Sequence, residues 1–301
     1  MHLTWLDTNT WLIEIGGQRI LIDPWLVDSL VFGKLDWLFK GSRPQNRPIP
    51  DNIDLIVLSQ GLDDHAHPPT LKQLDRTIPV VGSANAAKVV QQLGYTQVTA
   101  LAHGETFTLN QSVEIKATKG SSIGPNVVEN GYLIKEQESR FTLYYEPHGF
   151  HDPSLKSAAP VDVVITPIMD LGLPLIGSII KGTNSALEVA KWLQPQVMLP
   201  TAAPGEVVYE GLLINLLRAV GSIEEFRSLL TQNNLSTQVI EPKPGECFEL
   251  QLKPRALAVW RTSYLSEKGV SKAIAFDLIL ENHSLPTKTA PHLLLNHPET
   301  A

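Results

Sequence analysis

The sequence has few of the residues and signatures that define several common protein classes. Its one cysteine, Cys247, excludes an internal disulfide and a cysteine-based zinc cluster, which fits a reducing, cytoplasmic compartment. We expect Cys247 itself to be a small buried side chain. Basic residues are outnumbered, and the formal net charge of −7 argues against nucleic acid as a partner. No Gly-x-Ser-x-Gly elbow, phosphate-binding loop or dinucleotide fingerprint occurs.

Long apolar runs are also missing. The longest, Val161 to Ile180, is interrupted by Asp162, Asp170 and several glycines and prolines, so we predict no transmembrane segment. The N-terminus leads from His2 directly into strand-like sequence, and we expect no signal peptide. What is present is enough apolar material for a full core, since 43% of the 301 residues are hydrophobic.

The apolar pattern predicts a mixed α/β order. Alternating residues at 11–15, a Gly16-Gly17 turn and the run 20–22 are typical of a hairpin, which Asp23-Pro24 ends. Further strands and helices are expected in alternation along the chain. The strands are predicted at 53–58, 77–81, 97–100, 105–109, 113–118, 131–135, 141–145, 161–166, 197–200, 237–240 and 247–252. The helices are predicted at 68–74, 84–93, 184–193, 205–219 and 223–232.

The segment Ser59-Gln60-Gly61-Leu62-Asp63-Asp64-His65 follows the predicted strand 53–58, at the strand end where functional loops of α/β proteins gather. It resembles the His-x-His-x-Asp-His motif of the metallo-β-lactamase superfamily, with Gln60 and Leu62 at the two leading histidine positions. The N-terminal hairpin and its Asp-Pro-Trp ending look like those of the superfamily's UlaG-like branch. The resemblance implies a four-layer αββα sandwich, an α/β (α+β) fold, over residues 1–254.

The remaining metal ligands implied by the resemblance are mostly replaced. Gly120, or its neighbour Lys119, stands where the family has its next histidine, and Pro147 stands for the bridging aspartate. Thr201 and Ala202 stand where the last histidine belongs. We therefore expect the usual two-zinc centre to be lost.

Polar groups nevertheless remain at the same predicted edge. Asp64, His65 and His148 could hold one zinc, manganese or iron ion, because three protein ligands and a water satisfy a catalytic metal. We take these three as the candidate catalytic and metal-binding residues. Surface imidazoles in polar loops are the competing interpretation. Around them we expect a pocket lined by Asp63, His67, Lys119, Glu146, His151 and Asp170.

An apolar insertion at 26–50 follows the hairpin. Its large apolar groups predict a helix docked on the protein's own core, a lid over a pocket, or a surface for a protein partner or for peripheral lipid contact through 25–41. A second apolar loop is expected at 171–182. Residues 255–301 are predicted to be an extension with a helix or strand near 257–264 and another at 274–280, poorly ordered beyond 282.

The sequence leaves three alternative hypotheses for the function. The first is a metallo-β-lactamase-fold protein that has lost the two-zinc centre and binds a ligand or partner without catalysis. The second is a hydrolase with one metal held by His65, His148 and either Asp64 or Glu146. The third is a scaffold or assembly protein that acts through the insertion.

Overall fold

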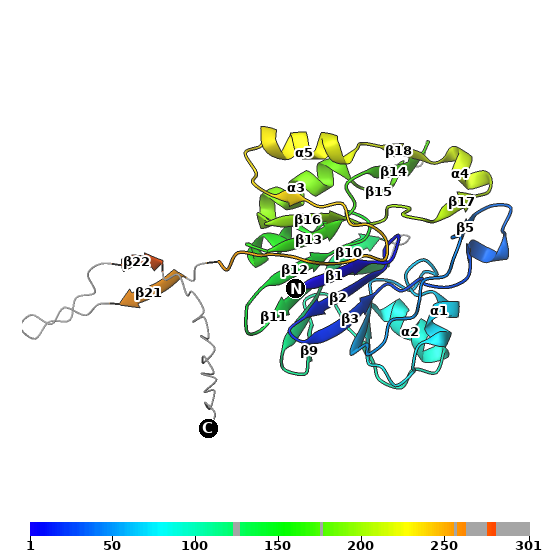
Figure 1. Cartoon of the computed structure of the whole chain (residues 1–301), viewed down its shortest axis with the longest axis horizontal. Helices are drawn as coiled ribbons and strands as arrows, with labels where there is room; N and C mark the ends of the chain where they lie inside the picture. The colour runs from blue at the N-terminus through cyan, green and yellow to red at the C-terminus, as the bar shows by residue number, and fades with distance from the viewer. Residues whose placement is uncertain (123–126, 175–176, 256–257, 263–275, 281–301) are drawn as a thin grey trace, which may run out of the picture. The chain divides into compact units, whose positions relative to one another are not determined.

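The computed structural model of the chain describes residues 1–122, 127–174, 177–255, 258–262 and 276–280 (Figure 1). The chain divides into two compact units, Met1–Leu252 and Lys253–Ala301. The first holds both large sheets and every helix of the described residues. In the second, β21 (Ala258–Thr262) pairs antiparallel with β22 (Phe276–Leu280), where the sequence predicted helix or strand. The prediction for the residues beyond 282 lies outside the described residues.

Two seven-stranded sheets form the body of the first unit. The first has the strand order β20-β1-β2-β3-β6-β7-β8 and the second β19-β16-β13-β12-β11-β10-β9. The strands of the first sheet are β1 (His2–Trp5), β2 (Trp11–Ile15), β3 (Gln18–Ile22), β6 (Leu55–Leu58), β7 (Val80–Gly82), β8 (Val98–Ala100) and β20 (Cys247–Glu249). Those of the second are β9 (Thr106–Leu109), β10 (Val113–Ser122), β11 (Val128–Glu136), β12 (Thr142–Tyr145), β13 (Val163–Thr166), β16 (Val197–Pro200) and β19 (Gln238–Val239).

Each sheet buries one face against the other sheet and its second face under helices. The central core joins alternate residues of both sheets, such as Ile13 and Val57 with Ile115 and Tyr145. The helices α1 (Pro68–Gln73) and α2 (Ala84–Gln92) cover the outer face of the first sheet. The helices α3 (Thr183–Leu193) and α5 (Ile223–Gln232) cover that of the second. The predicted αββα sandwich is thus confirmed.

The insertion at 26–50 does not contain the α-helix that one of the three interpretations proposed. It forms β4 (Leu30–Val31), the short 3-10 helix η1 (Phe32–Lys34) and β5 (Lys40–Ser42), and β5 pairs with β17 (Val208–Glu210). Leu26 and Leu30 are buried, whereas the Trp37 residue is 62% exposed. Leu26 and Leu30 therefore pack on the protein itself, as one interpretation expected, whereas Trp37 does not.

Two further segments differ from the expected structure. The loop predicted at 171–182 is a hairpin of β14 (Asp170–Leu173) and β15 (Gly177–Ile180), to which β18 (Arg218–Val220) is added. The helix predicted at 205–219 is reduced to α4 (Leu212–Leu216) between β17 and β18.

Cys247 is exposed rather than buried, since it lies on β20 at the edge of the first sheet. None of the helices in the described residues is long and apolar enough to cross a bilayer.

Candidate metal centre

The loop after β6 places the first two candidate residues. β6 is fully buried between β3 and β7, and the chain turns sharply after it, with the backbone N–H of His65 donating to the Leu62 carbonyl at 2.9 Å. His65 and Gln60 are fully buried, and Asp64 is half-buried. Leu62, at the second histidine position of the family motif, is 40% exposed. The turn therefore directs the last two motif positions inward and Leu62 outward.

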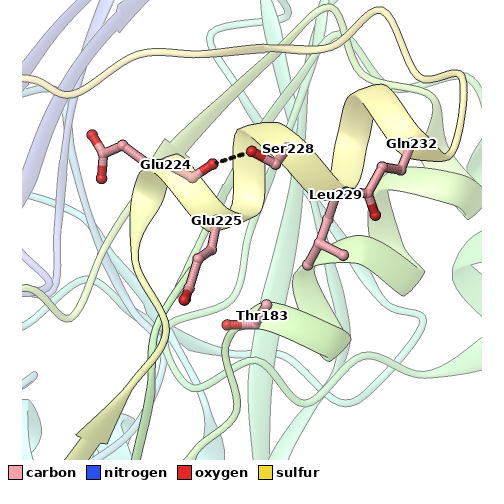
Figure 2. A pocket seen from close by; sticks show the side chains of 6 residues that line it. All are labelled: Thr183, Glu224, Glu225, Ser228, Leu229 and Gln232. Atoms are coloured by element: carbon pink, nitrogen blue, oxygen red, sulfur yellow. Dashed lines mark hydrogen bonds between the residues drawn. The ribbon is translucent and has the colours of Figure 1, made fainter.

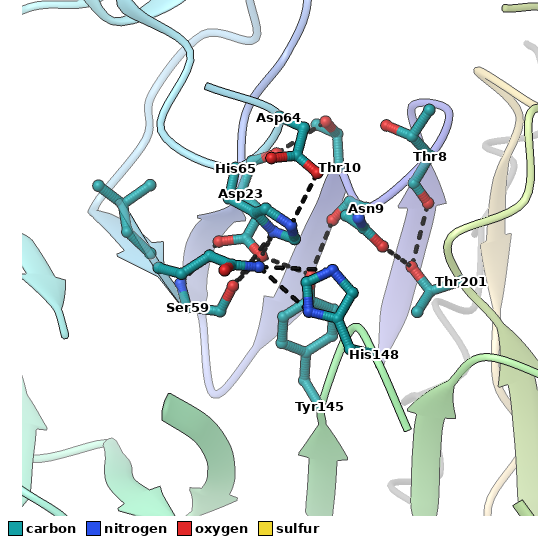
Figure 3. Close-up of polar contacts among 12 residues, drawn as sticks. Thr8, Asn9, Thr10, Asp23, Ser59, Asp64, His65, Tyr145, His148 and Thr201 are labelled. Atoms are coloured by element: carbon teal, nitrogen blue, oxygen red, sulfur yellow. Dashed lines mark hydrogen bonds and ion pairs between the residues drawn. The ribbon is translucent and has the colours of Figure 1, made fainter. Parts of the chain in front are cut away.

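Asp23, at the end of β3, fixes the orientation of His65 (Figure 3). Its buried carboxylate accepts hydrogen bonds from the Ser59 N–H at 2.7 Å, the Ser59 hydroxyl at 2.5 Å and the Tyr145 hydroxyl at 2.6 Å. It also lies 2.8 Å from His65 Nδ1. The bond to Asp23 keeps the proton on Nδ1, so Nε2 faces Asp64 Oδ2 at 3.2 Å. A carboxylate behind an imidazole is the usual arrangement for a histidine that ligates metal.

His148 reaches the same place from the turn after β12. Its ring meets that of His65 edge-on, with 5.0 Å between the ring centroids. Its Nδ1 lies 3.0 Å from the Ser121 hydroxyl and 3.2 Å from the Gln60 amide nitrogen. Glu146 fixes the turn, because its Oε2 accepts from the backbone N–H of His148 at 3.1 Å. Polar groups on both sheets therefore position this ring.

The structure brings Asp64, His65 and His148 together. Each offers one ligand atom, and these atoms lie within 4.8 Å of one another, which makes the three the candidate metal group of the described residues. Asp64 Oδ1 is buried and makes no hydrogen bond within the described part of the chain, and buried His65 Nε2 is paired there with Asp64 Oδ2 at 3.2 Å. Two imidazoles and a carboxylate are ligands that zinc, iron and manganese accept. The residues therefore fit one divalent ion.

Without an ion, the site carries one protonated imidazole. Burial lowers the pKa of His65, but the carboxylates of Asp64 and Asp23 outweigh burial and raise it to about 10. Burial and the charge on His65 lower the pKa of His148 to about 4. The pKa of Asp64 is lowered, since His65 outweighs its burial. At neutral pH two of the three candidate ligands are thus already in the form that binds metal.

The predicted pocket residues occupy several different places. Asp63 is exposed, and Asp170 accepts from the backbone N–H groups of Gly182 and Thr183 at the start of α3. His67 is buried against Trp25, with Nδ1 3.0 Å from the Thr70 hydroxyl. These three residues are not part of the candidate group.

Lys119 and His151 line a cavity of about 440 Å³ between the end of β10 and the start of α3. His151 packs against Tyr144 and lies 3.4 Å from the Thr166 hydroxyl, under α3. Another hollow of about 460 Å³ lies between α5 and the start of α3 (Figure 2). It is lined by Thr183, Glu224, Glu225, Ser228, Leu229 and Gln232. None of these is a predicted site residue.

The other ligand positions implied by the resemblance are filled by structural contacts. A Cβ on Gly120 would lie 2.9 Å from backbone atoms of Asn130 and Gly131, so β11 occupies the place of a side chain there. Pro147 is buried in the turn. The Thr201 hydroxyl donates to the Thr8 carbonyl at 3.0 Å and accepts from the Trp11 indole at 3.1 Å. These positions offer no second metal group in the described residues.

The sequence prediction missed the groups that support the candidate ligands: Asp23, Ser59, Gln60, Ser121 and Tyr145. Asp23 carried a signal, because an aspartate ends the strand that pairs with β6 and so lies at the same sheet edge. Tyr145 carried none, since its contact with Asp23 joins residues 122 apart in the sequence.

Residues 2–202 match the family of the Beta-lactamase superfamily domain, and the chain belongs to this family. A UPF0173 metal-dependent hydrolase of Roseobacter denitrificans is 26% identical over 151 residues, which are 48% of this chain and 61% of that protein. A UPF0173 metal-dependent hydrolase of Methanopyrus kandleri is 23% identical over 260 residues, which are 83% of this chain and 100% of that protein. The predicted resemblance to the metallo-β-lactamase superfamily and its UlaG-like branch is confirmed.

Solved structures show the same fold. An isothiocyanate hydrolase from Delia radicum gut bacteria superimposes with a TM-score of 0.61 at 18% identity, covering 83% of this chain and 99% of that chain. A metallo hydrolase from Ignicoccus hospitalis superimposes with a TM-score of 0.58 at 19% identity, with the same two coverages.

Proposed function

We propose that this chain is a hydrolase that uses one divalent metal ion held by Asp64, His65 and His148. The observation that carries the proposal is the convergence of three ligand atoms within 4.8 Å. In the described residues Asp64 Oδ1 makes no hydrogen bond, and His65 Nε2 is paired with Asp64 Oδ2, itself a candidate ligand, at 3.2 Å. The metal-dependent hydrolases among the relatives support it. Asp64, rather than Glu146, is the carboxylate of the group, because among the described residues it is Asp64 whose oxygen lies within 4.8 Å of both imidazoles.

The ion would supply Lewis acidity and activate water at neutral pH. The surrounding residues of the protein position the candidate ligands. Asp23 holds the proton on His65 Nδ1 and directs Nε2 into the site. Ser121 and Gln60 hold the His148 ring, and Glu146 holds its backbone. Glu146 is a positioning residue in this account, and its burial raises its pKa to about 7.

Turnover measurements test the proposal. Protein freed of metal and reloaded with zinc, manganese or iron(II) is assayed on chromogenic esters, thioesters, lactones and phosphodiesters. We expect metal-dependent turnover that His148→Ala lowers by about 100-fold or more. His103→Ala, which removes an exposed imidazole bonded to the Glu129 carbonyl, should leave turnover unchanged. Turnover that survives metal removal or His148→Ala would contradict the proposal.

Ligand binding without turnover is the second candidate function. The observation that favours it is that protonated His65 lies between the carboxylates of Asp23 and Asp64 and offsets one of their two negative charges without an ion. The replacement of the leading motif histidines by Gln60 and Leu62 points in the same direction. A protein of this kind would take up no metal at neutral pH, whereas the proposed hydrolase takes up one ion per chain.

A further inference from the structure

Arg43 is a buried, positively charged residue that has no part in the candidate metal centre. Its side chain is 1% exposed, and its guanidinium carbon lies 4.4 Å from the Trp25 ring centroid. Gly41, two residues earlier, lies between two rings: a Cβ there would be 2.8 Å from Trp25 and 3.0 Å from Tyr209. The arginine therefore enters the apolar cluster beneath the insertion, formed by Trp25, Leu30 and Val207 with Phe32, Phe39 and Tyr209 at its margin.

The hydrogen-bonding capacity of Arg43 is unused. Its Nε lies 3.3 Å from Asp7 Oδ2, but none of its three nitrogens makes a hydrogen bond within the described residues. Asp7 is already engaged, since Oδ2 accepts from Arg47 at 2.9 Å and Oδ1 accepts from the Glu206 N–H at 2.9 Å. Two guanidinium groups thus share one buried carboxylate, and Glu206, which also pairs with Arg47, is largely exposed. A buried cation with unused donors is strongly unfavourable unless another group engages them.

The Trp25 ring on which the guanidinium packs belongs to a segment that runs beside the candidate metal centre. Trp25 follows Asp23 by two residues, and His67 follows His65 by two residues. The Trp25 and His67 rings are 6.0 Å apart, while Asp23 and His65 are bonded at 2.8 Å, so the two segments run side by side. Tyr209 lies within reach of both charges: burial raises the pKa of its hydroxyl most, the charge of Asp64 raises it further, and that of Arg43 lowers it.

We propose that Arg43 binds an oxyanion group, a carboxylate or a phosphate, on the molecule that occupies the candidate metal centre. The inference rests on the proposed function for the reacting end of that molecule. A planar guanidinium with free N–H groups matches both oxyanions through paired hydrogen bonds. The nitrogens are closed off from solvent, and the half-buried Phe39 and Tyr209 rings of the same cluster are 5.6 Å apart. Binding in this way requires side chains of this cluster to move aside to admit the anion.

Titration of metal-free protein with inorganic phosphate, and separately with acetate, tests the inference by calorimetry in chloride buffer. At least one anion should bind the wild type, and Arg43→Lys should weaken that binding by about 10- to 100-fold. Arg19→Lys, a change in an arginine that pairs with Glu14 on the surface, should leave it unchanged. The anion that binds more tightly identifies the group on the substrate. Equal affinity in Arg43→Lys and wild type, or no binding of either anion, would overturn the inference.

A second measurement uses the wild-type protein alone, in case Arg43→Lys does not fold. The arginine ¹⁵Nε–¹Hε resonance of Arg43 should shift on addition of the bound anion, while that of Arg19 should not. An Arg43 resonance that stays unchanged at saturating anion would contradict the inference. Both tests use metal-free protein, so they are independent of metal uptake. Arg43-dependent anion binding without metal uptake would refute only the proposed hydrolase, and metal uptake without such binding would refute only the role of Arg43.

Discussion

Metal binding by this chain should release one proton and weaken about tenfold for each unit by which pH is lowered between about pH 9 and pH 5. The reason is His65, whose pKa is raised to about 10, so an incoming ion must displace its proton. The other two candidate ligands need no such exchange at pH 7. The pKa of Asp64 is lowered, and that of His148 is about 4.

The expected magnitude follows from the distance between pH 7 and the pKa of His65. Three pH units below that pKa, about one metal-free molecule in 1,000 has neutral His65, so the apparent affinity is about 1,000-fold lower than the intrinsic affinity. The same raised pKa stabilises the metal-free fold. That contribution is fully present below the unfolded pKa of about 6.5 and is lost as pH rises through about 10.

Calorimetric titration with zinc in two buffers of different ionisation enthalpy, at pH 6, 7 and 8, measures both the affinity and the number of protons released. Asp23→Asn removes one of the two carboxylates that raise the pKa of His65, and should release fewer protons than the wild type at pH 8. His103→Ala should behave as the wild type. Equal affinities at pH 6 and pH 8, or zinc binding without proton release, would refute this reasoning.

Three further predictions concern stability. Asp7→Asn leaves the buried Arg43 without the carboxylate that lies 3.3 Å from its Nε, and should lower the free energy of unfolding by about 3 kcal/mol or more, measured in urea at pH 7. An unchanged value would contradict the role given to Asp7. Burial lowers the pKa of His151 to about 3, so below about pH 6.5 the unfolded chain binds more protons than the folded one, and stability decreases as pH is lowered. His151→Gln should reduce the loss between pH 7 and pH 5 by about 2 kcal/mol, and an identical loss would be evidence against a neutral buried His151. Gly149→Ala places a Cβ 1.7 Å from the Lys181 carbonyl oxygen at a φ of 74°, and should cost about 3 kcal/mol in thermal unfolding; full stability would show that the turn is adaptable.

The sequence predicted the candidate ligands where an apolar run that forms a buried strand is followed directly by polar residues. The buried run 53–58 correctly indicated β6, and the motif after it led to Asp64 and His65. His148 was found by the same reasoning, because β12 also ends at the edge where the site lies. The structure places the three side chains together, while their roles in metal binding and catalysis remain predictions.

The insertion and the segment 205–219 could not be predicted in the same way. Both have apolar residues at helix-like spacing, but β5 pairs with β17, a partner about 170 residues later in the chain. Such pairing leaves no local signal, and it overrides helix propensity. The contacts of Asp23 with Tyr145 and of Arg43 with Asp7 are likewise set by the fold, so neither the role of Tyr145 nor the buried arginine was visible in the sequence.

Metal content is the most direct test of the central claim that Asp64, His65 and His148 form a metal centre. Untagged protein is incubated with zinc, manganese or iron(II), dialysed at pH 8 and measured by elemental analysis, beside His148→Ala and the control His103→Ala. We expect about one ion per chain in the wild type and in His103→Ala, and far less in His148→Ala. Metal well below one per chain with all three ions, or content unchanged by His148→Ala, would contradict the claim.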